Sequence, residues 1–424
     1  MKPQNLPETL IWYYIIGTYG FFILGAQFIV APLLAYFLMG YLVLQWWRQT
    51  PETPAPKRIK ISSTTWVWVV CMLMIEVALI MGHLDYNLGL FQIIKSSVNE
   101  WLRKWALFPV FLLISHLKIR PQLIYRAICI LCLQCLIIIP FVYLAVLIHF
   151  PTHFYTSPLE PLGGATAHYE VVLMDEFQAG QEIRLELFAP WETALGLLGN
   201  IYFLLTLQEQ NKRWRWIGVA GAVAMTVLSV SRLAVLCLPF TIVSVWLLTN
   251  FYRPWVQITA GLGSFLSGIL APILINWGSA FWSQFHSFRA SSSRVRLILV
   301  RMTLYRWRNE APIWGHGIGD SRGPAITKHM PLGSHHTWFS LLFTHGIVGC
   351  IAFAVAMIWS FIDLVIKAQN YQLAKVGLSI LLVILVFTIS EKVNTLAYLY
   401  WPGLIIIGKA FQVSNGEWEM GHRE

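Results

Sequence analysis

Residues 127–149 read AICILCLQCLIIIPFVYLAVLIH, without a single lysine, arginine, aspartate or glutamate. A membrane-spanning α-helix needs about 20 mostly apolar residues, and this stretch supplies them. Cys129, Cys132 and Cys135 repeat inside it at a spacing that also occurs in metal sites. Because no charged residue accompanies them, we interpret the three cysteines as small apolar side chains of a span. The stretch therefore predicts a helical membrane protein.

The composition of the whole chain extends this prediction. Of its 424 residues, 57% are hydrophobic and only 12% are charged, whereas soluble proteins carry about 25% charged residues. A single water-soluble core could not bury so much apolar surface. A formal net charge of +10 would suggest nucleic acid in a soluble protein, but basic cytoplasmic loops explain it first in a membrane protein. We therefore expect membrane lipids, and no nucleic acid, as partners.

Apolar segments of suitable length recur along the chain. They predict an all-α polytopic membrane protein with about twelve transmembrane helices in a single domain, residues 1–424. An N-terminal pair lies within Leu10–Trp46, divided between Gly20 and Gln27. The other spans are predicted at Trp66–His83, Trp105–Leu117, Ala127–His149, Trp191–Leu207, Trp214–Val230, Leu233–Leu248, Trp255–Trp277, Trp338–Leu364, Ala374–Ser390 and Leu396–Phe411.

The short loops set the orientation, because cytoplasmic loops are enriched in lysine and arginine. Basic residues follow the even-numbered spans, at Arg48, Lys57, Arg58, Lys60, Lys118, Arg120, Arg126, Lys212, Arg213, Arg215, Arg253, Lys367 and Lys375. These loops and both ends of the chain are therefore predicted to be cytoplasmic. Two long hydrophilic loops then face outward: residues 150–190, which are acidic, and residues 278–337, which are basic.

The second outward loop carries most of the chemistry. From Ser291 it reads SSSRVRLILVRMTLYRWRNE, and its arginines and apolar residues recur at near-heptad spacing. This pattern predicts an amphipathic helix against the membrane surface. Its arginines, among them Arg294, Arg296 and Arg301, either face solvent and lipid headgroups or clamp an anion such as a diphosphate.

A glycine-rich stretch follows this helix. Residues 312–319 read PIWGHGIG, in which the proline ends the helix and the glycines permit tight turns. Two interpretations remain open at this point. The stretch is either a plain connecting loop or a backbone cradle for phosphate.

Two histidines mark the point where the chain re-enters the membrane. Residues 335–349 read HHTWFSLLFTHGIVG. A histidine at the outer surface, such as His335, either acts as a general base or has no chemical role. We expect nearby arginines to keep His335 neutral. For His345, inside the span, we favour a packing role. Arg232, among apolar residues at a predicted outer boundary, either reaches the interface or faces a cavity.

Together these positions resemble the O-antigen ligase and polymerase superfamily, lipid-linked glycan transferases of the bacterial inner membrane. That family has a multi-span, GT-C-like architecture with a large periplasmic loop late in the chain. Its ligases carry an Arg-x-x-x-Leu motif, which Arg232 and Leu236 match. They also carry a histidine at a set distance before Gly-x-x-Gly, which His335, Gly346 and Gly349 match. His336 stands where the family has Asn, Ser or Gln.

The resemblance implies a glycan donor on undecaprenyl diphosphate and an acceptor hydroxyl on lipid A core. It implies inverting transfer at the periplasmic face, without a metal or other cofactor. The donor diphosphate is then held by Arg232 together with Arg296, or with Arg294 or Arg301 in its place. His335 is the implied general base, with His336 as the alternative. A basic loop poor in carboxylates suits a metal-independent site.

Other functions stay open at the level of sequence. A polymerase of the same superfamily uses the same donor and passes the glycan to another repeat unit. A polysaccharide transporter or flippase would favour charged residues at mid-membrane depth and two repeated halves with broken helices. The sequence has neither feature, so we place the transporter last.

Overall fold

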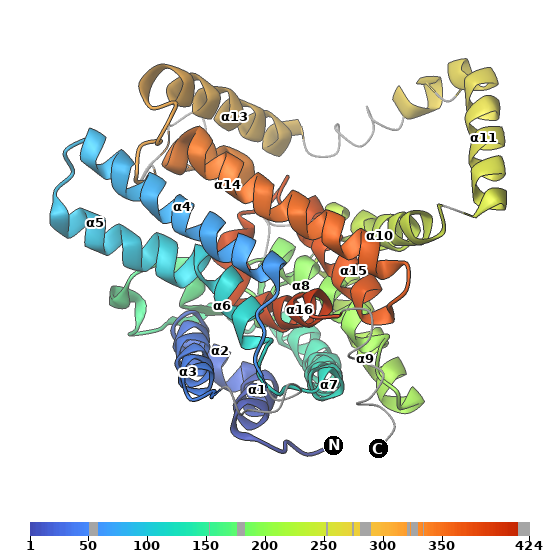
Figure 1. The fold of residues 1–424 in the computed structure, drawn as a ribbon, viewed down its shortest axis with the longest axis horizontal. Coiled ribbons are helices and arrows are strands. Elements are labelled where there is room, and N and C mark those ends of the chain that lie inside the picture. Colours follow the sequence, from blue (N-terminus) through green and yellow to red (C-terminus); the bar gives the residue numbers. More distant parts are fainter. Residues whose placement is uncertain are drawn as a thin grey trace.

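The chain folds mainly into helices that pack side by side (Figure 1). This computed structural model describes residues 1–50, 58–151, 153–175, 183–251, 253–273, 275–279, 290–319, 323, 330–333 and 335–413. The α-helices are α1 (Leu6–Ile16), α2 (Thr18–Ile23), α3 (Gln27–Trp47), α4 (Ser63–Asp85), α5 (Leu90–Ser96), α6 (Leu107–Ile114), α7 (Pro121–Leu147), α8 (Glu192–Thr206), α9 (Lys212–Leu228), α10 (Arg232–Asn250), α11 (Pro254–Ile269), α13 (Ala290–Glu310), α14 (Thr337–Ala368), α15 (Gln372–Phe387) and α16 (Ala397–Phe411). Short 3-10 helices are η3 (Glu160–Leu162), η4 (Thr166–His168) and η6 (Val393–Leu396).

Helical backbone is found at every predicted span. Among the described residues, five helices are long and apolar enough to cross a membrane: α3, α4, α7, α10 and α14. A sixth candidate is α11 together with the helix Ala271–Ser279, which it meets at 71°. The break between the N-terminal pair falls between α2 and α3, as predicted. The chain is thus a mainly helical protein with membrane-spanning helices, and the count of about twelve stays a prediction.

The fourth predicted span, Trp105–Leu117, differs from the structure. Helical backbone begins much earlier, with α5, and continues through the π-helix η2 (Ser97–Trp105) into α6. The sequence prediction started only after the charged residues of η2. Those residues have partners in the protein: Lys104 Nζ lies 2.6 Å from Glu100 Oε1, and Arg103 donates to the carbonyl oxygens of Leu162 and Gly163. Because Lys104 and Glu100 form an ion pair and Arg103 is hydrogen-bonded to carbonyl oxygens, the helix can continue through them.

The first outward loop, residues 150–190, contains all the β-strands in the described part of the chain. Strand β1 (His153–Thr156) pairs antiparallel with β2 (Glu170–Val172), and β3 (Met174–Asp175) pairs antiparallel with β4 (Arg184–Leu185). Tyr169 between them is fully buried, and Ser157 donates to the carbonyl oxygen of Leu24 at 3.0 Å. The loop therefore packs onto the turn between α2 and α3.

The predicted cytoplasmic loops gather at one end of the bundle. Arg120 and Arg126, from either side of the start of α7, form ion pairs with Glu8 at 2.6 Å and Glu209 at 2.8 Å. At the same end, Lys409 of α16 donates to the carbonyl oxygen of Leu117 at 2.9 Å. The grouping agrees with the alternation of basic loops from which the orientation is predicted.

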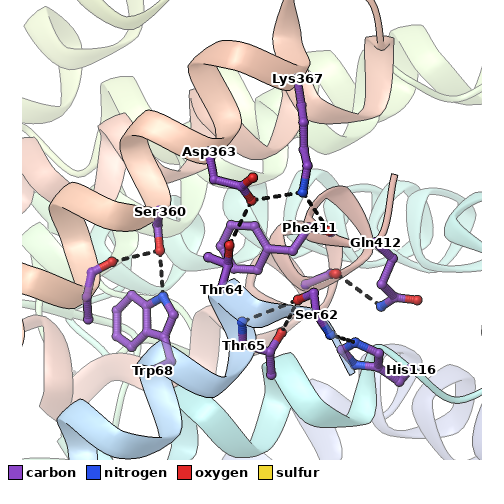
Figure 2. Close-up of polar contacts among 12 residues, drawn as sticks. Ser62, Thr64, Thr65, Trp68, His116, Ser360, Asp363, Lys367, Phe411 and Gln412 are labelled. Atoms are coloured by element: carbon purple, nitrogen blue, oxygen red, sulfur yellow. Dashed lines mark hydrogen bonds and ion pairs between the residues drawn. The ribbon is translucent and has the colours of Figure 1, made fainter. Parts of the chain in front are cut away.

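Polar side chains join α4 to α14 at this end (Figure 2). Thr64 donates to Asp363 at 3.0 Å, and Lys367 lies 2.9 Å from the same carboxylate. One turn further, Trp68 Nε1 donates to Ser360 Oγ at 2.7 Å. Hydrogen bonds of this kind supplement van der Waals packing between helices where lipid provides no hydrophobic drive. They hold α14, which carries the candidate site at its other end.

The cysteines of α7 are buried, as expected for small apolar side chains of a packed helix. Cys129, Cys132 and Cys135 are all buried and free. Cys132 packs against Gly221 of α9 so closely that a Cβ there would lie 2.5 Å from the Cys132 carbonyl oxygen. A small residue on each helix therefore permits the close approach of α7 and α9.

Candidate functional site

The site predicted from the sequence lies at the start of α14, and the structure anchors this start firmly. Thr337 Oγ1 donates to the carbonyl oxygen of Glu391 at 2.6 Å and accepts from the backbone N–H of Val393 at 3.1 Å. The Thr337 N–H donates to the carbonyl oxygen of Thr388 at 3.0 Å, and Trp338 Nε1 donates to Thr388 Oγ1 at 2.9 Å. The first turn of α14 is therefore bound to the segment between α15 and α16.

His335 and His336 directly precede this turn, and both are half-buried. His335 has a φ of 62°, a left-handed conformation that is uncommon for a residue with a side chain and often marks a functional position. His336 occupies the N-cap position of α14 without a side-chain capping hydrogen bond, and its ring packs on Phe339 with centroids 4.2 Å apart. His336 Nδ1 is buried and has no hydrogen-bond partner among the described residues.

Burial lowers the pKa of His336 to about 4. Its imidazole is therefore neutral at neutral pH and has a lone pair that can accept a proton. The sequence argument assigned such a neutral state to His335 and named nearby arginines as its cause. For His336 the cause is burial alone.

Arg232 lies at the same end of the bundle as the histidine pair. It is the first residue of α10 and half-buried, and Ser231 before it caps the helix. Asn200 of α8 donates to the carbonyl oxygen of Ala234 at 3.0 Å, which joins α8 to this first turn. At the start of α8, Thr193 Oγ1 donates to the Glu391 carboxylate at 2.5 Å. One chain of contacts thus connects the first turn of α10, through α8 and Glu391, with the first turn of α14.

The loop arginines lie on α13, so a helix forms where the sequence predicts one, while its place against the membrane surface stays a prediction. Val295, Leu299 and Met302 of this helix pack with Phe343 of α14, so its apolar side contacts protein. Figure 1 shows α13 alongside α14. Arg301 is exposed. The side chains of Arg294 and Arg296 lie outside the described residues.

The glycine-rich stretch is a structural loop that fits into a break in α14. Non-helical backbone at Gly346, with φ 61° and ψ −161°, interrupts that helix. The backbone N–H groups of His316 and Gly317 donate to the carbonyl oxygens of Phe343 at 2.8 Å and Thr344 at 3.0 Å. Two N–H groups beyond the break donate in return to the carbonyl oxygens of residues 312 and 313. These N–H groups are therefore not available to cradle a phosphate.

The glycines at this junction are needed for close backbone approach. A Cβ on Gly315, whose φ is 73°, would lie 2.5 Å from the backbone nitrogens of both His345 and Gly346. A Cβ on Gly346 would collide with the carbonyl oxygen of Ile313. The glycines of the sequence motif thus have a packing role.

His316 ties the end of α13 to the same junction. Its Nε2 lies 2.8 Å from Glu310 and its Nδ1 lies 3.0 Å from the carbonyl oxygen of Phe343. Arg306 Nε contacts the same Glu310 carboxylate at 2.9 Å. Desolvation raises the pKa of Glu310, but hydrogen bonds from His316 and Arg306 outweigh it and hold the pKa below its usual value.

A group of buried charges near the start of α14 was missed by the sequence argument. Glu100 and Lys104 of η2 lie within electrostatic range of His345 of α14 and of Lys392, which precedes η6. Burial lowers the pKa of Lys392 to about 8, which the Glu100 carboxylate opposes and Lys104 reinforces. Two signals in the sequence could have revealed this group: the charged stretch before Trp105, and the pair Glu391–Lys392 between two apolar segments.

No three His, Cys, Asp or Glu side chains in the described part of the chain lie close enough together to hold a metal ion. Metal independence of the reaction remains a prediction. The chain matches no protein-family model, and a search of curated proteins finds no similar sequence. The site and the resemblance noted above are therefore the basis for assigning a function.

Proposed function

We propose that the chain is a metal-independent, inverting glycosyltransferase of the O-antigen ligase type in a bacterial inner membrane. It moves a glycan from undecaprenyl diphosphate to a hydroxyl of lipid A core at the periplasmic face. The observation that carries the proposal is the position of the pair His335–His336, of which His336 is neutral, at the anchored start of α14 and at the same end of the bundle as Arg232. A base and a permanent cation are what transfer from a diphosphate requires.

The reaction assigns a role to each residue. His335, or His336 in its place, accepts the proton of the acceptor hydroxyl as its oxygen bonds to the anomeric carbon. The bond from that carbon to the diphosphate oxygen breaks on the opposite face, so the configuration inverts. The electron pair leaves with the diphosphate. Arg232 and an arginine of α13, namely Arg296, Arg294 or Arg301, stabilise its charge.

The surface glycan of a deletion strain tests the proposal. Loss of polymer-capped lipopolysaccharide, with long lipid-linked polymer accumulating, is the expected result for a ligase. Capping by a single repeat unit would instead identify a polymerase that uses the same donor. Unchanged lipopolysaccharide and unchanged lipid-linked intermediates would contradict both and favour a transporter or flippase of other cargo.

The orientation is tested by cysteine labelling in a background free of the native thiols. Asn309 on α13 and Arg213 at the start of α9 are both exposed and belong to loops predicted on opposite sides. Asn309→Cys should react with an impermeant maleimide in cells whose outer membrane alone is permeabilised. Arg213→Cys should react only after the inner membrane is lysed. The reverse pattern would place the candidate site in the cytoplasm.

We expect glycan transfer to require an arginine at position 232. Alanine removes charge-assisted hydrogen bonds to the diphosphate, worth about 1.5–3 kcal/mol each, so transfer should fall at least tenfold. Arg232→Lys should fail as well, because an ammonium cannot make the planar two-point contact of a guanidinium. Transfer is measured with purified lipid-linked donor in EDTA, at matched protein levels. Full activity of both variants would remove Arg232 from the site.

A further inference from the structure

His345 presents a fixed hydrogen-bond acceptor inside the protein. Its side chain is 2% exposed, and its Nδ1 lies 2.6 Å from Thr344 Oγ1. Thr344 Oγ1 already donates its hydrogen to the carbonyl oxygen of Ser340 at 2.7 Å. We therefore assign the Thr344 oxygen as the acceptor from His345 Nδ1, which then carries the hydrogen. In the neutral ring, Nε2 is left with a lone pair and has no partner among the described residues.

The surroundings of this lone pair are polar. His345, Glu100, Lys104 and Lys392 form what we call the buried polar cluster. Glu100 is only partly enclosed, since 41% of its side-chain surface is accessible. Lys392 is half-buried, and its ammonium forms no hydrogen bond or ion pair with another described residue. Trp105 presents an aromatic ring 6.2 Å from the imidazole of His345.

We propose that the buried polar cluster binds the sugar of the lipid-linked donor next to its diphosphate, with one sugar hydroxyl donating to His345 Nε2. This inference rests on the proposed function and specifies where its donor sugar lies. The cluster offers hydrogen-bond acceptors at His345 and Glu100 and a donor at Lys392. These suit sugar hydroxyls, because each hydroxyl can both donate and accept a hydrogen bond. Lys104 is paired with Glu100, so Lys392 leaves the cluster with a single uncompensated positive charge, which is less than the charge of a diphosphate diester.

The position of the cluster suits this role. His345 lies nine residues after His336 on α14, which is about 13 Å along the axis at the rise of an α-helix. Lys392 lies near the start of α14, because its neighbours Glu391 and Val393 contact Thr337, and it is also within electrostatic range of His345. A sugar that contacts both Lys392 and His345 therefore lies next to the histidine pair.

The test compares two probes that differ only in the sugar: undecaprenyl diphosphate N-acetylglucosamine and undecaprenyl diphosphate. Binding of each to the purified full-length protein is measured by native mass spectrometry. His345→Leu removes the acceptor and should weaken binding of the sugar-bearing probe about tenfold, the loss of one buried hydrogen bond, while binding of the sugar-free probe stays unchanged. His345→Gln keeps an acceptor near Nε2 and should bind both probes like the unmodified protein.

His116→Leu is the matched control, since the imidazole of His116 also packs within the protein but accepts from the backbone N–H of Ser62, just before the start of α4 (Figure 2), and so lies away from the start of α14. It should change binding of neither probe. Equal weakening of both probes by His345→Leu would place the diphosphate in the cluster and overturn the proposal. Binding that does not depend on residue 345 would overturn it while leaving the transferase function intact. An unmodified protein that binds neither probe would contradict the transferase function itself and this inference with it.

Discussion

His335→Ala is expected to reduce glycan transfer by about 10²–10⁴-fold, the usual cost of removing a general base. The residue lies in a left-handed turn just before the anchored start of α14. Because Thr337 holds that turn to Glu391 and Val393, the loss should leave folding and donor binding unchanged. The rate is measured with purified lipid-linked donor and acceptor in EDTA, and donor binding is measured separately.

His336→Asn is the matched variant for this prediction. Asparagine restores the residue type that the O-antigen ligases carry beside their histidine, and it is also a good N-cap. It should therefore keep most of the activity. If His336→Ala loses activity and His335→Ala does not, the base is His336, whose neutral imidazole already has an unpartnered nitrogen. If both alanine variants stay active, the base lies elsewhere.

The second large effect is a loss of folding stability, which we expect for Gly346→Ala. At φ 61° and ψ −161° the backbone is in a region that only glycine adopts without strain, at about 1–3 kcal/mol for another residue. The added methyl group would also collide with the carbonyl oxygen of Ile313. Together these costs should exceed about 3 kcal/mol and place the change among the strongly destabilising ones. Thermal unfolding in detergent and protein abundance in the membrane are the measurements.

Gly40→Ala provides the control, since a Cβ at this exposed position in α3 would meet no atom within 4 Å. It should leave the unfolding temperature unchanged or raise it slightly. Gly315→Ala should behave like Gly346→Ala, because it disturbs the same junction from the other side. An unfolding temperature equal to that of the unmodified protein in both junction variants would contradict the backbone pairing between residues 312–317 and α14.

The positions of the helices could be predicted from the sequence because they depend on local properties. A long apolar segment such as residues 127–149 predicts a helix, whether lipid or other helices surround it. The prediction was least accurate where charge interrupted the run. The predicted fourth span started only after residues 97–104, yet these form most of the π-helix η2, because Glu100 pairs with Lys104 and Arg103 binds carbonyl oxygens of a distant loop.

The candidate site could likewise be predicted only in part. Sequence order alone singled out Arg232 and the pair His335–His336, since motif spacing is a property of the chain. It also left the glycine-rich stretch open between a phosphate cradle and a connecting loop. That choice needed the tertiary structure, in which the N–H groups of His316 and Gly317 already donate to carbonyl oxygens of α14.

By itself, then, the sequence determined the class of protein, the approximate helix positions and the alternation of basic loops, because each follows from residues that are neighbours in the chain. Only the tertiary structure placed His345 beside Glu100 and Lys392, which are far apart in sequence. Only the hydrogen bond from Thr344 to Ser340 leaves His345 Nε2 as an acceptor. The physical reason is that the burial and charge environment of a side chain depend on which helices pack around it.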